Sequence, residues 1–306
     1  MQTILGSSGV IGRELAKSLT QYTNKIRLVS RNPKKVNDSD EIVSADLLSA
    51  EQTSKAVQGS EVVYLTVGIQ YKLSLWQQQW PLIMKNVIEA CKQNNSKLVF
   101  FDNVYVYGKV NGWITEQSPI KPDSKKGEVR AMLADMIMNE VGKGNLKAII
   151  ARAADFYGPN TPLSFVTVTV FENFKKGKKA MWFIDADKKH SFTYTADGGK
   201  ATAKLGNTET AYNQIWHLPT SKNVLTGKEF IELAAKAFGI KPDYTILKKW
   251  MIQLVGLFNS NVRESVEMLY QNQSVYLFDS TKFERAFNFK PTSYELGILE
   301  TVQSMK

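Results

Sequence analysis

Hydrophobic positions change their period repeatedly along the first 160 residues of the chain. Short apolar runs lie at 2–5, 25–31, 41–47, 60–68, 96–108 and 146–159. Between these runs, apolar residues recur three or four positions apart, which is the period of an amphipathic helix; the segments are 13–22, 51–59, 77–95 and 128–145. Strands that alternate with helices predict an α/β fold with a doubly wound parallel sheet.

A glycine-rich turn joins the first predicted strand to the first predicted helix. Gly6, Gly9 and Gly12 stand three residues apart within ILGSSGVIG. In a strand–turn–helix unit, the first glycine permits the tight turn, the second allows a pyrophosphate to approach, and the third allows close packing of the helix. We therefore predict a dinucleotide-binding turn, with a purely structural turn as the alternative. Its predicted cofactor contacts are Gly6, Ser7, Gly9, Val10, Ile11 and Gly12.

The pattern is less regular after residue 160. The segment 165–199 mixes strand-like runs with a basic loop, 213–219 predicts a strand, and 250–271 predicts mostly helix. A helix over 226–239 has defined ends, because Thr226 is followed three positions later by Glu229 and the segment stops at Gly239. A strand and a short helix are predicted over 274–291.

This pattern predicts two domains. The first is a dinucleotide-binding domain over 1–160, to which segments near 190–206 and 274–280 return. The second is a smaller α/β substrate lobe over 161–306, which we expect to hold the substrate at the carboxyl edge of the sheet.

The end of the second predicted strand favours NADP over NAD. A dinucleotide site for NAD usually places an acidic residue there, whereas a basic residue accommodates the 2′-phosphate of NADP. The chain has SRNPKK at 30–35, without an acid. Arg31 can present a planar, charged fork to a phosphate, and Lys34 adds charge. The alternative is that Arg31 is an ordinary surface arginine.

Composition narrows the class of partner and the compartment. The net charge is +10, but the lysine pairs are scattered and no nucleic-acid motif accompanies them. We therefore predict no nucleic-acid partner and a small, anionic molecule as substrate. The chain has one cysteine and no apolar run near the ~20 residues of a membrane span. These features favour a cytoplasmic protein without a membrane partner.

Five further motifs of the sequence resemble those of a known family. They are ADL at 45–47, NVIEAC at 86–91, VYG at 106–108, RAADFYGP at 152–159 and HSFTYTADGGKA at 190–201. Together with the glycine turn, they resemble the extended short-chain dehydrogenases/reductases, also called the NAD-dependent epimerase/dehydratase family. The resemblance implies a Rossmann-type nucleotide-binding domain. It also implies cofactor contacts at Asp46, Leu47, Gly68 and Asp155.

The catalytic positions of that family are occupied by other residue types. The family has a Ser or Thr five residues before the glycine of VYG, where this chain has Asn103. A Tyr-x-x-x-Lys pair then opens the next helix, where KGEVR places Lys126 at the Tyr position and Arg130 at the Lys position. A lysine acts as a general acid only where burial or a neighbouring cation lowers its pKa. We predict Lys126, Asn103 and Tyr107 as catalytic candidates, with a solvated Lys126 as the alternative.

Two functions follow from these expectations. The first is an atypical epimerase, dehydratase or reductase that binds NADP and acts on a nucleotide sugar or a carbonyl compound. The second is a sensor or regulatory module that binds NADP(H) without catalysis. In both, Arg130 is expected to hold the nicotinamide ribose. A homodimer is expected through the helices that contain Trp80, Leu82, Ile83, Met132, Leu133, Met136 and Ile137.

Overall fold

The computed structural model describes residues 1–306, apart from the side chain of Asn261. The chain forms two compact units that alternate along the sequence. Unit 1 comprises 1–103, 128–152 and 196–218, and unit 2 comprises 104–127, 153–195 and 219–306.

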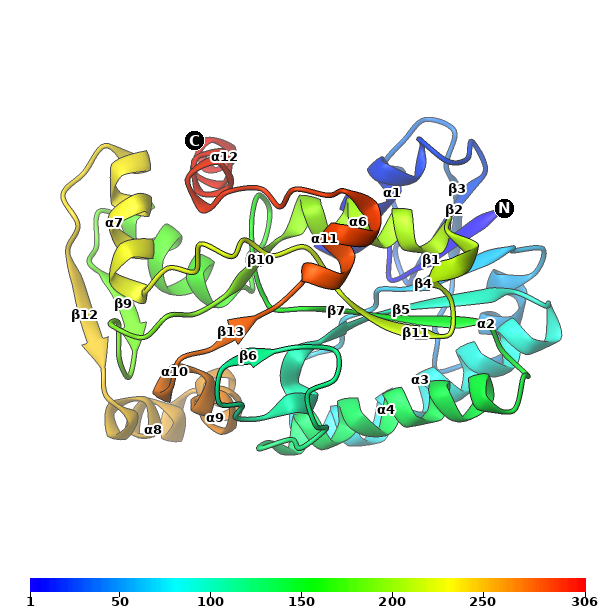
Figure 1. Ribbon diagram of the computed structural model, residues 1–306, viewed down its shortest axis with the longest axis horizontal. Helices are drawn as coiled ribbons and strands as arrows, with labels where there is room; N and C mark the ends of the chain where they lie inside the picture. The colour runs from blue at the N-terminus through cyan, green and yellow to red at the C-terminus, as the bar shows by residue number, and fades with distance from the viewer. The chain divides into compact units, whose positions relative to one another are not determined.

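Unit 1 contains a seven-stranded parallel sheet, which confirms the predicted α/β fold with a doubly wound parallel sheet. The strand order is β11-β7-β5-β4-β1-β2-β3 (Figure 1). The chain first adds β2 and β3 on one side of β1, and it then adds β4, β5, β7 and β11 on the other side. The strands are β1 (Gln2–Leu5), β2 (Ile26–Ser30), β3 (Glu41–Ser44), β4 (Val62–Leu65), β5 (Lys97–Asn103), β7 (Ala148–Ala153) and β11 (Gln214–His217).

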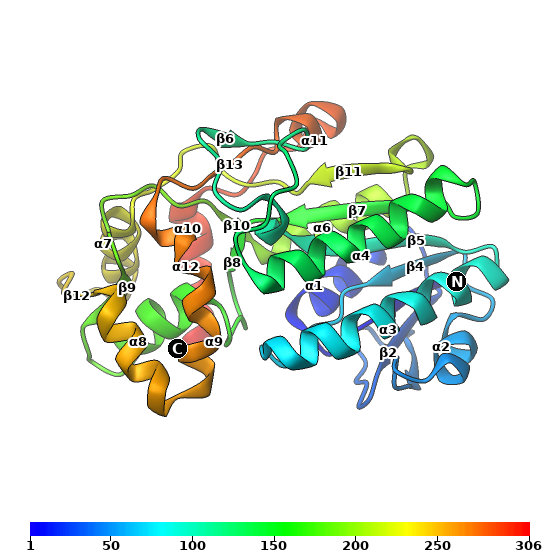
Figure 2. The same cartoon turned by 90° about the horizontal axis from the view of Figure 1, so that it is seen from below.

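Helices cover both faces of this sheet. The helices α1 and α6 lie on one face, and α2, α3 and α4 lie on the other, which Figure 2 shows in front of the strands. Since β4 and β7 are buried along their whole length, their residues form nearly continuous apolar runs, which only Arg152 of β7 interrupts. The helices are α1 (Val10–Leu19), α2 (Ala50–Val57), α3 (Leu73–Gln93), α4 (Lys125–Gly142, of which 128–142 belong to this unit) and α6 (Thr195–Gly206, of which 196–206 belong to this unit).

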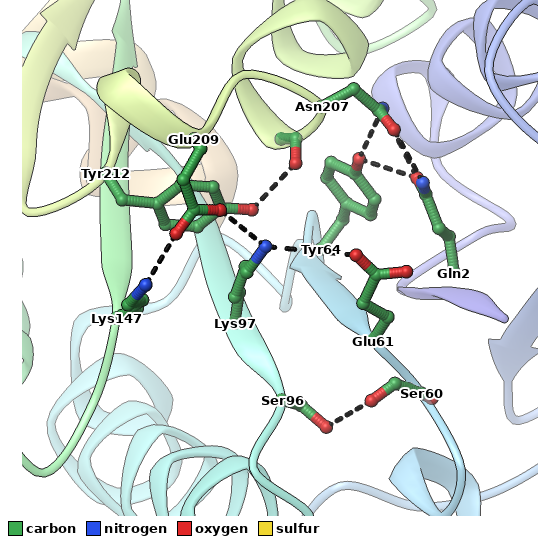
Figure 3. Close-up of polar contacts among 11 residues, drawn as sticks. Gln2, Ser60, Glu61, Tyr64, Ser96, Lys97, Lys147, Asn207, Glu209 and Tyr212 are labelled. Carbon is green, nitrogen blue, oxygen red and sulfur yellow. Dashed lines mark hydrogen bonds and ion pairs between the residues drawn. The ribbon is translucent and has the colours of Figure 1, made fainter.

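A polar network ties together the strands of unit 1 near their amino ends (Figure 3). The Tyr64 hydroxyl donates to Oε1 of Gln2 over 2.8 Å, and Nε2 of Gln2 donates to Oδ1 of Asn207 over 2.7 Å. Glu209, in the short helix η3 (Glu209–Ala211), accepts from Lys97 over 2.6 Å and from Lys147 over 2.5 Å. The polar groups at this edge therefore bind one another.

Unit 2 contains three small parallel sheets and several helices. Its strand pairs are β8 (Asp155–Tyr157) with β10 (Phe192–Tyr194), β9 (Ala180–Phe183) with β12 (Tyr244–Leu247), and β6 (Trp113–Ile114) with β13 (Leu277–Phe278). The helical segments are η1 (Val104–Tyr107), η2 (Thr167–Phe171), α5 (Glu172–Lys175), α7 (Gly227–Phe238), α8 (Lys249–Phe258), α9 (Ser260–Ser265), η4 (Val266–Met268), α10 (Tyr270–Gln273), α11 (Thr281–Phe287) and α12 (Tyr294–Met305).

The ends of α7 confirm the prediction made from the sequence. The Thr226 hydroxyl accepts a hydrogen bond from the Glu229 backbone N–H, and the Glu229 carboxylate accepts from the Thr226 backbone N–H. Gly239 follows the helix with a φ of 75°, a left-handed conformation that favours glycine.

One strand-like run forms a helix instead. The structure places residues 165–175 in one continuous helical segment that includes η2. The alternation of Val and Thr predicted strand, but Val166, Val170 and Phe174, four residues apart, are all buried. The Ser164 hydroxyl also accepts from the Thr167 backbone N–H, which satisfies a donor at the helix start. Tertiary burial therefore outweighs the strand propensity of the β-branched residues.

We predict that Glu209 makes unit 1 sensitive to acid. Hydrogen bonds from Lys147 and Lys97 lower the pKa of Glu209 from 4.5 to about 2. A carboxylate with a lowered pKa stabilises the fold above its unfolded pKa, and this contribution is lost as the pH falls through the folded pKa. Urea unfolding should therefore show that Glu209→Gln lowers stability at pH 7 and flattens its decline between about pH 4.5 and 2.

A matched control is Glu295→Gln, which removes an exposed glutamate of α12 without a side-chain partner among the described residues. The prediction fails if Glu209→Gln and Glu295→Gln have the same pH dependence.

Candidate active site at the carboxyl edge of the sheet

The glycine turn between β1 and α1 is closely packed. Gly6 has a φ of 98°, and a Cβ added there would lie 2.5 Å from the backbone of Val67. A Cβ at Gly12 would lie 2.7 Å from the carbonyl oxygen of Gly6. Neither position can accept a side chain without a backbone shift, so these two glycines are required by the turn itself.

The start of α1 is open to an anionic ligand. Gly9 is the N-cap and supplies no side chain to the free N–H groups of the first turn, which also has no acidic residue. The Ser7 hydroxyl is buried and has no hydrogen-bond partner among the described residues. Free N–H groups, the helix dipole and an unused hydroxyl suit a phosphate. The turn therefore fits the pyrophosphate of a dinucleotide.

Arg31 follows β2 and is available to a ligand. Its side chain is exposed and makes no ion pair with the residues that the structure describes. The backbone around it is fixed, because the Ser44 hydroxyl donates to the Arg31 carbonyl oxygen over 2.9 Å. Lys34 is exposed on the same loop.

The remaining predicted cofactor contacts of unit 1 lie after neighbouring strands. Asp46 and Leu47 follow β3, and Gly68 follows β4. Asp46 and Gly68 are exposed, whereas Leu47 is buried. Because parallel strands end at one edge of a sheet, these residues share that edge with the glycine turn and Arg31.

A buried ion cluster occupies the end of β5 in unit 1. The Asp102 carboxylate accepts from Nε of Arg130 over 2.7 Å and from Nε of Arg152 over 3.0 Å. All three side chains are at most 5% exposed. The Arg130 guanidinium also stacks on aromatic rings, 4.6 Å from the ring centroid of Trp80 and 4.7 Å from that of Phe100. Arg130 is thus held by an internal partner before any ribose binds.

Lys126 is held by a second ion cluster, which lies in unit 2. Its ammonium donates to Oε2 of Glu264 over 2.7 Å, to Oε1 of Glu267 over 2.8 Å and to the Glu264 carbonyl oxygen over 3.0 Å. The side chain is only 1% exposed. An ammonium has three N–H donors, and at least three acceptors lie within hydrogen-bond distance of them here.

The other predicted catalytic residues do not share one unit. Asn103 is half-buried at the end of β5 in unit 1, whereas Tyr107 is buried in η1 of unit 2. Asp155 also belongs to unit 2, where its carboxylate lies 2.9 Å from Nε2 of His190. The His190 ring stacks on Tyr276 at 5.2 Å between centroids. The sequence did not predict the Asp155–His190 pair, because a spacing of 35 residues carries no local signal.

Two features are absent from the described part of the chain. No group of three or more His, Cys, Asp or Glu side chains is placed there to bind a metal ion. None of the helices described combines the length and the apolar character that crossing a bilayer requires.

The parallel sheet, the closely packed glycine turn and the open start of α1 define a Rossmann-type nucleotide-binding protein. Residues 3–215 match the model of the NAD dependent epimerase/dehydratase family. The chain belongs to this family.

One curated protein is similar to this chain in sequence. The chain is 25% identical to a 3beta-hydroxysteroid-dehydrogenase/decarboxylase isoform 2 of Arabidopsis thaliana, over 98% of this chain and 61% of the relative. It thus spans about three fifths of that relative's length.

Two solved structures share the fold over nearly their whole length. A UDP-glucuronic acid 4-epimerase from Bacillus cereus, in complex with NAD, has a TM-score of 0.82 and 17% identity, over 100% of this chain and 98% of that one. A dTDP-glucose 4,6-dehydratase double mutant from Streptomyces venezuelae, also with NAD bound, has a TM-score of 0.82 and 16% identity, over 99% and 96%.

We predict that Asp102 is essential to the stability of unit 1. Asp102→Asn keeps the size of the side chain but removes the negative charge that both buried arginines bind. Removing one partner of a buried ion pair costs about 3–5 kcal/mol. Urea unfolding measures this loss. Asp135→Asn, on the exposed side of α4, is the control and should change stability by less than about 0.5 kcal/mol. Equal stabilities of the two variants would contradict the prediction.

Proposed function

We propose that the chain is an NADP(H)-dependent enzyme of this family that acts on a small molecule of the nucleotide-sugar or carbonyl class. The nicotinamide cofactor agrees with the NAD found in the two solved relatives. The preference for NADP rests on one observation: the stretch 30–35 at the end of β2 offers the exposed Arg31, which has no ion pair among the described residues, and contains no acidic residue.

In this proposal, each part of the cofactor has its own residues. The turn from Gly6 to Gly12 holds the pyrophosphate through backbone N–H groups, and Arg31 with Lys34 binds the 2′-phosphate. Asp46, Leu47 and Gly68 lie along the adenine half, and Arg130 contacts the nicotinamide half; Asp155, which belongs to unit 2, stays a prediction from the family resemblance. The bound cofactor would supply hydride transfer. The protein would supply binding, orientation and a proton.

The second candidate, a non-catalytic NADP(H) sensor, is favoured by the two ion clusters. Lys126 and Arg130 stand where the family has its Tyr and Lys. Lys126 donates to Glu264 and Glu267, and Arg130 is paired with Asp102. Groups with internal partners are poorly placed to exchange protons with a substrate. Asn103 and Tyr107 are then the remaining catalytic candidates.

A homodimer through α3 and α4 belongs to the same proposal. Of the apolar side chains expected at this interface, Trp80, Ile83, Leu133 and Ile137 are buried within unit 1 and cover its sheet. Leu82 and Met132 are exposed, and these two side chains remain available to a second copy.

We predict that Arg31 determines the choice of cofactor. A charge-assisted hydrogen bond to a phosphate contributes about 1.5–3 kcal/mol, so Arg31→Ala should weaken NADPH binding ~10- to 100-fold. NADH binding should change less than threefold. Calorimetry with both nucleotides measures the two affinities. Lys25→Ala removes an exposed charge just before β2, at its other end, and is the matched control. Equal affinity of the unaltered protein for NADPH and NADH would contradict the proposed preference.

Lys126→Met separates the enzyme from the sensor. If Lys126 transfers a proton, the variant should lower turnover by ~10²- to 10⁴-fold and leave NADPH affinity nearly unchanged. If the chain is a sensor, neither protein oxidises NADPH in a screen of carbonyl and nucleotide-sugar substrates. Both models predict lower stability, because the variant leaves Glu264 and Glu267 without their counter-ion. An active enzyme whose turnover survives the substitution would exclude Lys126 as the acid.

A further inference from the structure

The helix α8 in unit 2 exposes most of its large apolar side chains. Phe258 is 89% exposed, Leu257 69% and Trp250 62%, and Leu254 and Val255 are about half exposed. Trp250, Leu254, Leu257 and Phe258 follow a helical spacing of four, three and one residues, so they form one stripe. A contiguous apolar surface of this kind marks an interaction site on a folded protein.

The exposed stripe is not the side of α8 that packs onto unit 2, because another side of the helix is already buried there. Ile252 and Gly256 are both buried. Gly256 packs against α9, where an added Cβ would lie 3.1 Å from Cα of Arg263. Figures 1 and 2 show α8 and α9 side by side as a hairpin. Lys126 fixes this hairpin within unit 2 through Glu264 and Glu267. The stripe is therefore presented by an anchored helix.

The hairpin is positively charged around the stripe. Lys248 is the N-cap of α8, Lys249 is its first residue and Arg263 lies in α9; all three are exposed and have no ion pair among the described residues. The acids of the hairpin region, Glu264 and Glu267, are paired with Lys126. Cations at a helix N-terminus oppose the helix dipole. Helix stability therefore does not explain Lys248 and Lys249, whereas an anionic partner does.

We propose that α8 docks the protein onto the surface of a bilayer that contains anionic lipids. A helix of ten residues is about 15 Å long, too short to span a membrane but suited to lie in the interface. Trp250, Leu257 and Phe258 would enter the boundary between headgroups and acyl chains. Lys248 and Lys249, which immediately precede Trp250, would lie against the lipid phosphates.

Charge favours a lipid surface over a second copy of the chain. Each copy has a net charge of +10, so pairing two of them brings like charges together. A bilayer with anionic headgroups has the opposite charge. The proposal departs from the prediction, made from the sequence, of a protein without a membrane partner. That prediction rested on the absence of a long apolar run, and an interfacial helix needs no such run.

Vesicle co-sedimentation tests the proposal with the full chain and without substrate. The protein should bind vesicles of phosphatidylcholine and phosphatidylglycerol (3:1) at low salt, and neutral vesicles at least tenfold less. The variant W250S/L257S/F258S should reduce vesicle binding at least tenfold. The variant K248E/K249E should reduce binding at least tenfold on the anionic vesicles only, because each lysine near the surface raises the affinity for anionic lipid about fivefold. Lipids brominated on their acyl chains should quench Trp250 fluorescence, and W250F should lose most of that quenching.

Two matched variants of unit 2 provide the controls. L296S/L299S removes exposed leucines from α12, and K228E/K236E reverses two exposed lysines on α7. Both should bind vesicles within twofold of the unaltered protein. The altered side chains of α8 are exposed, so thermal unfolding should confirm that the variants are folded.

Three results would overturn the proposal. One is that the unaltered protein does not bind anionic vesicles. Another is that the α8 variants bind as well as the controls. The third combines two observations. The unaltered protein is a dimer in light scattering that W250S/L257S/F258S converts to a monomer, and neither the unaltered protein nor the variant binds vesicles. The stripe would then be an interface between two copies of the chain. Because no outcome uses a cofactor or a substrate, failure here leaves the proposed function untouched.

Discussion

The buried carboxylate of Asp102 holds the part of unit 1 at which the chain crosses to unit 2. Unit 1 breaks off after Asn103, resumes at Glu128 and breaks off again after Arg152. Asp102, Arg130 and Arg152 each lie within two residues of one of these crossings, and one carboxylate binds both guanidinium groups. Three separate pieces of sequence are thereby fixed to one point. A purely apolar contact there would bury the pieces but would not fix their register, because dispersion contacts have little directional preference.

The two ion clusters suggest a structural role for Lys126 and Arg130, the residues that the resemblance aligns with the catalytic positions of the family. Taken alone, a lysine and an arginine one helical turn apart look like a modified proton relay. In the structure, each has an acidic partner from another segment: Glu264 and Glu267 for Lys126, and Asp102 for Arg130. The start of α4, where the resemblance places the catalytic positions of the family, therefore makes contacts that stabilise both units. A substitution there is informative only when stability and nucleotide affinity are measured together.

Elements that depend on a local pattern of residues could be predicted from the sequence. Elements and contacts that depend on segments far apart in the sequence could not. The strands of unit 1, the turn from Gly6 to Gly12 and the ends of α7 follow from period, glycine spacing and capping residues. The helical segment at 165–175 was predicted partly as strand, because burial of Val166, Val170 and Phe174 is a tertiary effect. The helix α12 was not predicted at all. The partners of Lys126 lie 138 and 141 residues away, so no spacing rule could identify them.

The two edges of the sheet in unit 1 differ in how many of their polar groups have partners within the protein, and this difference supports the proposed nucleotide site. At the amino edge, Gln2, Tyr64, Asn207 and Glu209 have internal partners, so few polar groups there remain for a ligand (Figure 3). At the carboxyl edge, the start of α1 has no side-chain cap, the Ser7 hydroxyl is unused among the described residues, and Arg31 is unpaired. Buried polar groups and helix ends without partners are costly, and folded proteins satisfy them unless another molecule does so. In the proposed function, a phosphate-bearing ligand would satisfy the buried Ser7 hydroxyl and the free N–H groups of α1, and the exposed Arg31 would pair with its charge.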